Sequence, residues 1–167
     1  MRKRGIRVIV FGRTDKSDFL LVPLVLVIAY STLANTLGLP IWFVLIRPFW
    51  NSVISGWVGL ILNLVSIVGF ALTLASFGDS FRVGIDEEKP DKLITLGMFA
   101  ISRNPIYVCF LLFFTGLFLV HRNIVIAVAI VLFALAIHRQ VIREEEFLAS
   151  HYGEEYEEYR TKVRRYL

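Results

Sequence analysis

Long apolar runs separated by short polar segments dominate the pattern of this chain. Four such runs occupy residues 19–37, 53–77, 105–120 and 124–137. About 20 apolar residues cross the core of a bilayer as a helix, so the first two runs have spanning length. The last two are shorter, and the turn His121-Arg122-Asn123 between them indicates a helical hairpin. Residues upstream of Pro105 could lengthen the third run, with a kink at the proline.

The second run carries a stripe of small and weakly polar residues. They recur at steps of three, four or seven positions and therefore share one helical face: Ser52, Gly56, Gly59, Asn63, Ser66 and Thr73. Small residues on one face are typical of close packing between membrane helices. A path for a substrate along the same stripe is the alternative interpretation.

Beyond Ile137 the polar content rises, but the periodicity stays helical. An apolar stripe recurs at steps of three or four and consists of Leu148, Tyr152, Tyr156, Tyr159, Val163 and Leu167. Four glutamates between positions 154 and 158 oppose it, and Gly153 can bend or break the helix. Tyrosine suits a boundary between water and membrane. The pattern predicts a helix that lies along the membrane surface or caps the bundle.

Composition agrees with a membrane protein. Of 167 residues, 56% are hydrophobic and only 19% are charged, less than a soluble surface requires. The net charge is +4, and because the basic residues flank apolar runs, membrane lipids are the expected partner and nucleic acid is not. The single cysteine, Cys109, excludes an internal disulfide, and the sequence has no metal-binding, dinucleotide-binding or P-loop motif. The expected fold is an all-α integral membrane protein of about four transmembrane helices, with the hairpin in its C-terminal half and a cytoplasmic or interfacial C-terminal helix.

The distribution of lysine and arginine predicts an orientation. Residues 1–18 form a basic arm with six of them, residues 78–104 contain four, and residues 138–167 contain six. The two other connections carry one arginine each, Arg47 and Arg122. The positive-inside rule therefore places both termini in the cytoplasm. The expected organisation is the arm at 1–18, two transmembrane helices within 19–77 and a core unit at 78–167.

Charged and polar residues gather at the ends of the third and fourth runs. The segment Ser102-Arg103-Asn104-Pro105-Ile106-Tyr107 opens the third run, and Arg139, Gln140, Arg143, Glu144 and Glu145 follow the fourth. On a helix Gln140 and Glu144 share a face. Ionised groups at the end of a membrane helix need partners and are functional candidates. Anchoring by basic residues, with a solvated acidic run, is the alternative.

These two segments resemble the integral membrane methyltransferases related to isoprenylcysteine carboxyl methyltransferase, of which the phospholipid methyltransferases are relatives. The family pattern Gly-x-[Tyr/Phe]-x-x-x-Arg-His-Pro-x-Tyr is similar to residues 97–107. The pattern Glu-Glu-x-x-Leu, followed by Phe/Tyr-Gly-x-x-Tyr-x-x-Tyr, is matched within residues 144–159. The resemblance covers about half of the chain, and the order of the two motifs around a hairpin makes it fairly specific.

The resemblance implies a helical membrane bundle that binds S-adenosylmethionine at its cytoplasmic side. The cofactor-binding residues it implies are Asp91, Lys92, Leu93, Ile94, Phe99, Arg103, Asn104, Pro105, Ile106, Tyr107 and Glu144. It implies that Arg139 or Gln140 serves the methyl acceptor, and Glu145 is a further candidate catalytic residue. Asn104 and Asp91 depart from the pattern, since both stand where histidine is usual or frequent. Asparagine donates a hydrogen bond but does not titrate near neutral pH.

The expected function is methyl transfer from S-adenosylmethionine to a lipidic or lipidated acceptor, for instance the carboxylate of a prenylcysteine-type substrate. A carboxylate is already anionic, whereas an amine must first lose a proton to a base. The asparagine at position 104 therefore favours a carboxylate or thiolate. The alternatives are N-methylation of a phospholipid amine, a non-catalytic membrane anchor, and a membrane reductase, for which no dinucleotide motif is present.

Overall fold

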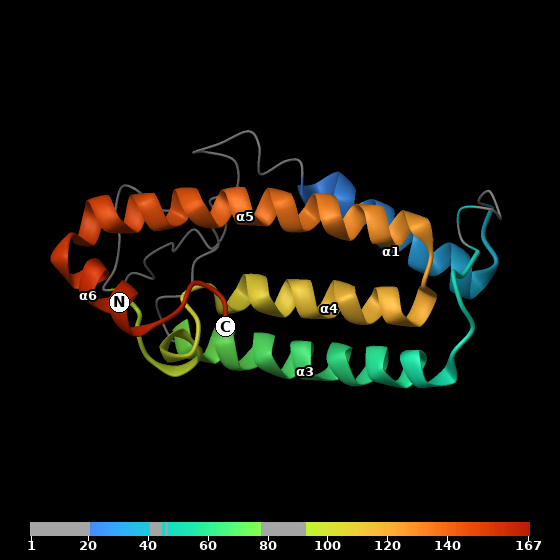
Figure 1. Cartoon of the computed structure of the whole chain (residues 1–167), viewed down its shortest axis with the longest axis horizontal. Coiled ribbons are helices and arrows are strands. Elements are labelled where there is room, and N and C mark those ends of the chain that lie inside the picture. The colour runs from blue at the N-terminus through green and yellow to red at the C-terminus, as the bar shows by residue number, and fades with distance from the viewer. Residues whose placement is uncertain (1–20, 41–44, 46, 78–92) are drawn as a thin grey trace, which may run out of the picture.

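The computed structural model describes residues 21–40, 45, 47–77 and 93–167, and the regular secondary structure within them is helical (Figure 1). The helices are α1 (Leu21–Leu37), α3 (Val53–Phe77), the short 3₁₀ helix η3 (Gly97–Ala100), α4 (Pro105–His121), α5 (Ile124–Tyr152) and α6 (Glu154–Lys162). The basic arm at residues 1–18, and Asp91 and Lys92, lie outside the described residues.

Helices α3, α4 and α5 run along the long axis of the molecule, with α4 between the other two (Figure 1). α3 packs mainly against α4, and α1 packs against α5. The predicted hairpin is confirmed. Arg122 ends α4 in the left-handed conformation, with φ of 54°, and the Asn123 side chain accepts a 3.0 Å hydrogen bond from the Ile126 amide at the start of α5.

The predicted small-residue stripe of α3 faces α4 from Gly59 to Ser66, while the space beside Gly56 is open. A Cβ atom added to Gly59 would lie 2.6 Å from the carbonyl oxygen of Gly116, so the two backbones are in close contact. Ser66 is buried and donates a 2.6 Å hydrogen bond to the carbonyl oxygen of Cys109. The interpretation of the stripe as a helix-packing surface is therefore confirmed.

The hydrophobic core is small and lies between α1, α4 and α5. Its buried members are Ile28, Phe114, Ala129, Phe133, Ile137 and Val141. Many large apolar side chains of α3 and α5 are instead exposed on the outside of the bundle. Among the described helices, α3 and α5 are long and apolar enough to cross a membrane, while α1 and α4 are shorter apolar helices of 17 residues each.

Two expectations about helix ends require correction. α4 begins at Pro105 and is not extended upstream, because proline favours the first helical position and its ring disfavours helical geometry at Asn104. The predicted bend at Gly153 is confirmed, with φ of 54°, but the helix beyond it ends at Lys162. Residues 163–167 are not helical, and Leu167 is exposed instead of continuing the apolar stripe.

Candidate functional site

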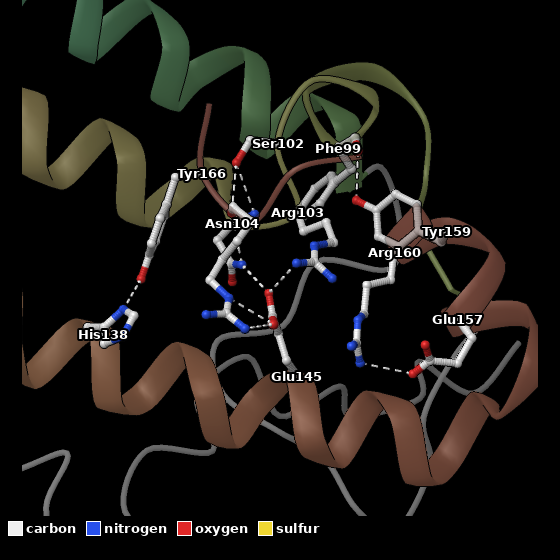
Figure 2. A network of polar contacts seen from close by, with 11 residues as sticks. Phe99, Ser102, Arg103, Asn104, His138, Glu145, Glu157, Tyr159, Arg160 and Tyr166 are labelled. Atoms are coloured by element: carbon white, nitrogen blue, oxygen red, sulfur yellow. Dashed lines mark hydrogen bonds and ion pairs between the residues drawn. The ribbon is translucent and has the colours of Figure 1, made fainter. Parts of the chain in front are cut away.

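A polar cluster occupies the end of the bundle where α4 begins and α5 ends. Three segments that are distant in sequence meet there: residues 97–104, the last third of α5 with α6, and residues 163–167 (Figure 2). η3 is attached to this end by two hydrogen bonds. The Met98 amide donates to Ser76 Oγ at 3.1 Å, and the Tyr159 hydroxyl donates to the Phe99 carbonyl oxygen at 2.6 Å.

Glu145 lies at the centre of the cluster and is only 8% exposed. Its Oε1 accepts a hydrogen bond from Asn104 Nδ2 at 3.1 Å and lies 3.4 Å from Arg103 Nη2. Its Oε2 lies 3.0 Å from Arg165 Nε and 2.9 Å from Arg165 Nη2. Both carboxylate oxygens are thus engaged. Removing one partner of a buried charge typically costs about 3–5 kcal/mol, so Glu145 joins α5 firmly to the start of α4.

Arg103 has unsatisfied hydrogen-bonding capacity in this buried cluster. Its side chain is 8% exposed, and its Nε and Nη1 atoms are buried without a hydrogen-bond partner. Burial raises the pKa of Tyr156, and its interaction with Arg103 partly lowers it, but the Tyr156 hydroxyl is also buried without a partner of full hydrogen-bond geometry. Buried polar groups are nearly always paired, and an unpaired one costs about 1–3 kcal/mol. These donors therefore suit a ligand that carries hydrogen-bond acceptors.

Glu144 forms a second cluster on a neighbouring face of α5. Its Oε1 accepts hydrogen bonds from the Tyr107 hydroxyl at 2.6 Å and from Gln140 Nε2 at 3.0 Å. The three side chains are partly buried, so the carboxylate is within reach of solvent. Tyr107 and Gln140 thus orient the Glu144 carboxylate at the boundary between α4 and α5.

Tyr159 stays protonated in this environment. Burial, followed by the neighbouring Tyr156, raises the pKa of Tyr159 to about 12. The hydroxyl therefore remains a hydrogen-bond donor to Phe99 throughout the physiological range. The aromatic pair anchors α6 to η3 and keeps both near the cluster.

Residues 163–167 complete the site, and the sequence analysis did not identify them as functional. The Arg103 amide donates to the Arg164 carbonyl at 2.9 Å, and the Arg165 carbonyl accepts from Ser102 Oγ at 3.3 Å and Asn104 Nδ2 at 3.1 Å. The Tyr166 hydroxyl lies 2.8 Å from His138 Nδ1 on α5 (Figure 2). A basic segment near the end of a chain carries no signal for such contacts, because its partners are about 60 residues away in sequence.

Most of the sequence-predicted residues come together here. Arg103 and Asn104 lie with Glu145, while Tyr107 and Gln140 lie with Glu144. The others occupy the surroundings: Pro105 is buried, Ile106, Phe99, Leu93 and Ile94 are half-buried, and Arg139 is exposed. The structure therefore brings Gln140, but not Arg139, to Glu144.

The chain is similar to membrane methyltransferases. The family described as phospholipid methyltransferase matches residues 48–155, more than half of the chain. Two proteins, from Oryza sativa subsp. indica and subsp. japonica, are each named probable protein-S-isoprenylcysteine O-methyltransferase. Each is 32% identical over 124 residues, which cover 71% of this chain and 62% of the relative.

A bacterial protein is similar over a comparable region. The nickel-cobalt-cadmium resistance protein NccN of Alcaligenes xylosoxydans xylosoxydans is 28% identical over 127 residues, which cover 71% of this chain and 59% of NccN. The chain thus spans less than two thirds of the length of these curated relatives. No solved structure matches the chain significantly.

Proposed function

Since this chain belongs to the phospholipid methyltransferase family, we propose that it transfers a methyl group from S-adenosylmethionine to a lipidic or apolar acceptor at the membrane boundary. The observation that carries this proposal is the cluster of Glu144, Tyr107 and Gln140, which joins the two motifs across the α4–α5 pair. Two apolar helices of spanning length support membrane association.

The described residues fit the charges of this cofactor. Its methionyl part carries a carboxylate and an ammonium group, and its ribose carries two hydroxyls. The buried Nε and Nη1 of Arg103, which have no hydrogen-bond partner, would hold the carboxylate. The Glu144 carboxylate would hold the ammonium or the ribose hydroxyls. When bound, the cofactor supplies a methyl group activated by its positively charged sulfur.

A carboxylate is the acceptor that this chain suits best. Asn104, which stands where the family pattern has histidine, donates to Glu145 and cannot remove a proton from an amine. An anionic acceptor needs no base. Arg139 is exposed, and its planar guanidinium can hold a carboxylate by two parallel hydrogen bonds. We therefore propose that Arg139 binds the acceptor, and that Gln140, which donates to Glu144, supports cofactor binding.

The chemistry requires alignment more than acid–base catalysis. Methyl transfer from a sulfonium is an in-line displacement at carbon, and oriented proximity alone can supply about 7–11 kcal/mol. The attacking anion and the cation neutralise one another as the reaction proceeds. A site that excludes water favours this loss of charge.

Orientation in the membrane forms part of the proposal. Arg103, Arg139 and Arg143 lie at the end of the bundle that holds the polar cluster, whereas Arg122 lies at the opposite end. The positive-inside rule then directs the cluster toward the cytoplasm, where S-adenosylmethionine is available. A lipidic acceptor would enter from the bilayer between helices.

Ligand titration tests this function directly. We expect the purified protein in detergent to bind S-adenosylmethionine and its product S-adenosylhomocysteine by calorimetry. NADPH is the control ligand for the reductase alternative and should not bind. Absence of binding by both adenosyl ligands would overturn the proposal, as a non-catalytic anchor predicts. A methyl-transfer assay with a prenylcysteine carboxylate and with a phospholipid amine then compares the two acceptors.

A further inference from the structure

Two arginines approach one buried carboxylate, and they do so unequally. Arg165 contacts Glu145 Oε2 through two nitrogens, at 3.0 and 2.9 Å. Arg103 contacts Oε1 through Nη2 alone, at the longer distance of 3.4 Å. Both Arg165 nitrogens contact the same oxygen at charge-assisted hydrogen-bond distances, which are shorter than the Arg103 contact, although the Arg165 side chain is 40% exposed. Arg165 is therefore the main counterion of Glu145.

Because Arg165 holds Glu145 Oε2, Arg103 uses only one of its nitrogens for this carboxylate. Its Nε and Nη1 are buried and have no partner with full hydrogen-bond geometry, although the Tyr156 hydroxyl lies close enough to interact with the guanidinium. If Arg165 did not hold Oε2, the nearest cation to the buried Glu145 charge would be Arg103. Arg103 would then turn its remaining N–H groups to the carboxylate, because an uncompensated buried charge is costly.

We propose that Arg165 is a positioning residue, which neutralises Glu145 and thereby keeps Arg103 available for the carboxylate of the cofactor. The inference rests on the proposed function, since the ligand of Arg103 is the methionyl carboxylate. Arg165 touches no ligand in this scheme. It acts through Glu145, and Glu145 acts through the orientation of Arg103.

The backbone, and not the Arg165 side chain, attaches residues 164 and 165 to the rest of the protein. The Arg164 and Arg165 carbonyls accept hydrogen bonds from Arg103 N, Ser102 Oγ and Asn104 Nδ2, and none of these contacts uses the Arg165 side chain. Tyr166 is held independently by His138 and by the apolar core. A substitution at Arg165 should therefore leave residues 163–167 in place.

A pair of ligands distinguishes positioning from general support. S-adenosylhomocysteine carries the carboxylate, and methylthioadenosine lacks it. We expect Arg165→Gln to weaken S-adenosylhomocysteine binding about tenfold or more, the loss of roughly one hydrogen bond to a charged group, and to change methylthioadenosine binding less than about twofold. Arg165→Lys keeps a cation beside Glu145 and should restore most of the affinity. Arg164→Gln, at the exposed neighbouring position, is the matched control and should alter neither.

The opposite results would overturn the inference. Equal loss of both ligands in Arg165→Gln would mean a structural role only, and unchanged S-adenosylhomocysteine affinity would mean no role. If the wild-type protein binds neither ligand, the proposed function fails, and with it the ligand assigned to Arg103.

Competition between the two arginines is tested without any ligand. In a double-mutant cycle followed by thermal unfolding, Arg103→Gln should lower Tm much more in the Arg165→Gln background than in the wild type. The reason is that Arg103 becomes the only close cation of Glu145 among the described residues. Additive shifts in Tm would show that the arginines do not compete and would overturn the inference by themselves.

Discussion

Glu144 and Glu145 are neighbours in sequence, but they occupy different environments. Successive residues on a helix are turned by about 100°, which directs one carboxylate to Tyr107 and Gln140 and the other to two arginines. The accessible carboxylate suits a ligand, whereas the enclosed one connects segments. The expectation that Glu145 is catalytic stays a prediction, and its contacts favour a positioning role.

Glu144→Gln tests the accessible carboxylate. The substitution keeps the size of the side chain but removes the charge proposed to face the ammonium or ribose of the cofactor. We expect S-adenosylmethionine affinity to fall by about 1.5–3 kcal/mol, the range for a hydrogen bond to a charged group. Glu146→Gln changes the exposed glutamate two positions along α5 and should leave affinity unchanged. Calorimetry on both folded variants decides, and equal affinities would assign Glu144 to the solvated surface.

Arg139 and Gln140 are expected to act on different substrates. Arg139→Lys keeps the charge but loses the planar fork, so kcat/KM for a carboxylate acceptor should fall about tenfold while cofactor affinity is retained. Gln140→Ala removes a donor to Glu144 Oε1 and should instead weaken cofactor binding. Measuring both parameters for both variants separates the two roles. Full activity in both would show that α5 does not hold the acceptor.

The α3–α4 pair is the rigid element on which the site is built. Gly59 and Gly116 bring the two backbones together, and hydrogen bonds from Ser66 and Ser55 to α4 carbonyls add to the contact. Apolar side chains gain little from association within lipid, so helix pairs there depend on close packing of small residues. The position of Tyr107 relative to α3 follows from this contact.

Gly59→Ala should therefore destabilise the bundle. The added methyl group would lie 2.6 Å from the Gly116 carbonyl oxygen, and forced overpacking typically costs about 1–3 kcal/mol. Gly56→Ala, one turn earlier on the same stripe, has no atom within 4 Å of the added carbon and is the matched control. Thermal unfolding in detergent compares them. Equal stability of both variants would contradict a close α3–α4 contact.

The molecule as a whole separates polar from apolar surface along its long axis. The charged clusters occupy the end near the α5–α6 bend, and the outer faces of α3 and α5 between the two ends are apolar. This distribution matches a bundle set in a bilayer with its polar site at one surface. It also gives the two ends of the bundle opposite expected locations.

Cysteine labelling tests the orientation in intact membranes. In a background with Cys109→Ala, we expect Glu155→Cys on α6 to react with an impermeant reagent from the cytoplasmic side only. Asn51→Cys, exposed before the start of α3, should react from the opposite side only. The Lys and Arg distribution is the physical reason. Labelling of both positions from one side would contradict the spanning arrangement.

Local patterns were sufficient to predict the apolar α-helices and the small-residue stripe, but not η3 or the end of α6 at Lys162. The second and third apolar runs end within a residue of α3 and α4, because the apolar pattern, Pro105 and the His121-Arg122-Asn123 turn act on nearby backbone. The pairing of Gln140 with Glu144 was equally local, since four residues make one helical turn. These features depend only on residues a few positions apart, so they can be predicted from the sequence.

The assembly of the polar site was decided only by the tertiary structure. Nothing in the sequence distinguishes Arg165 from Arg164, yet the half-exposed Arg165 side chain pairs with Glu145, whereas Arg164 is exposed. The difference arises because residues 163–167 leave the helical periodicity after Lys162 and cross the start of α4, where backbone contacts to residues about 60 positions away hold the segment in place. The cations that pair with a buried carboxylate are those that helix packing brings close to it, so the tertiary structure determines the pairing.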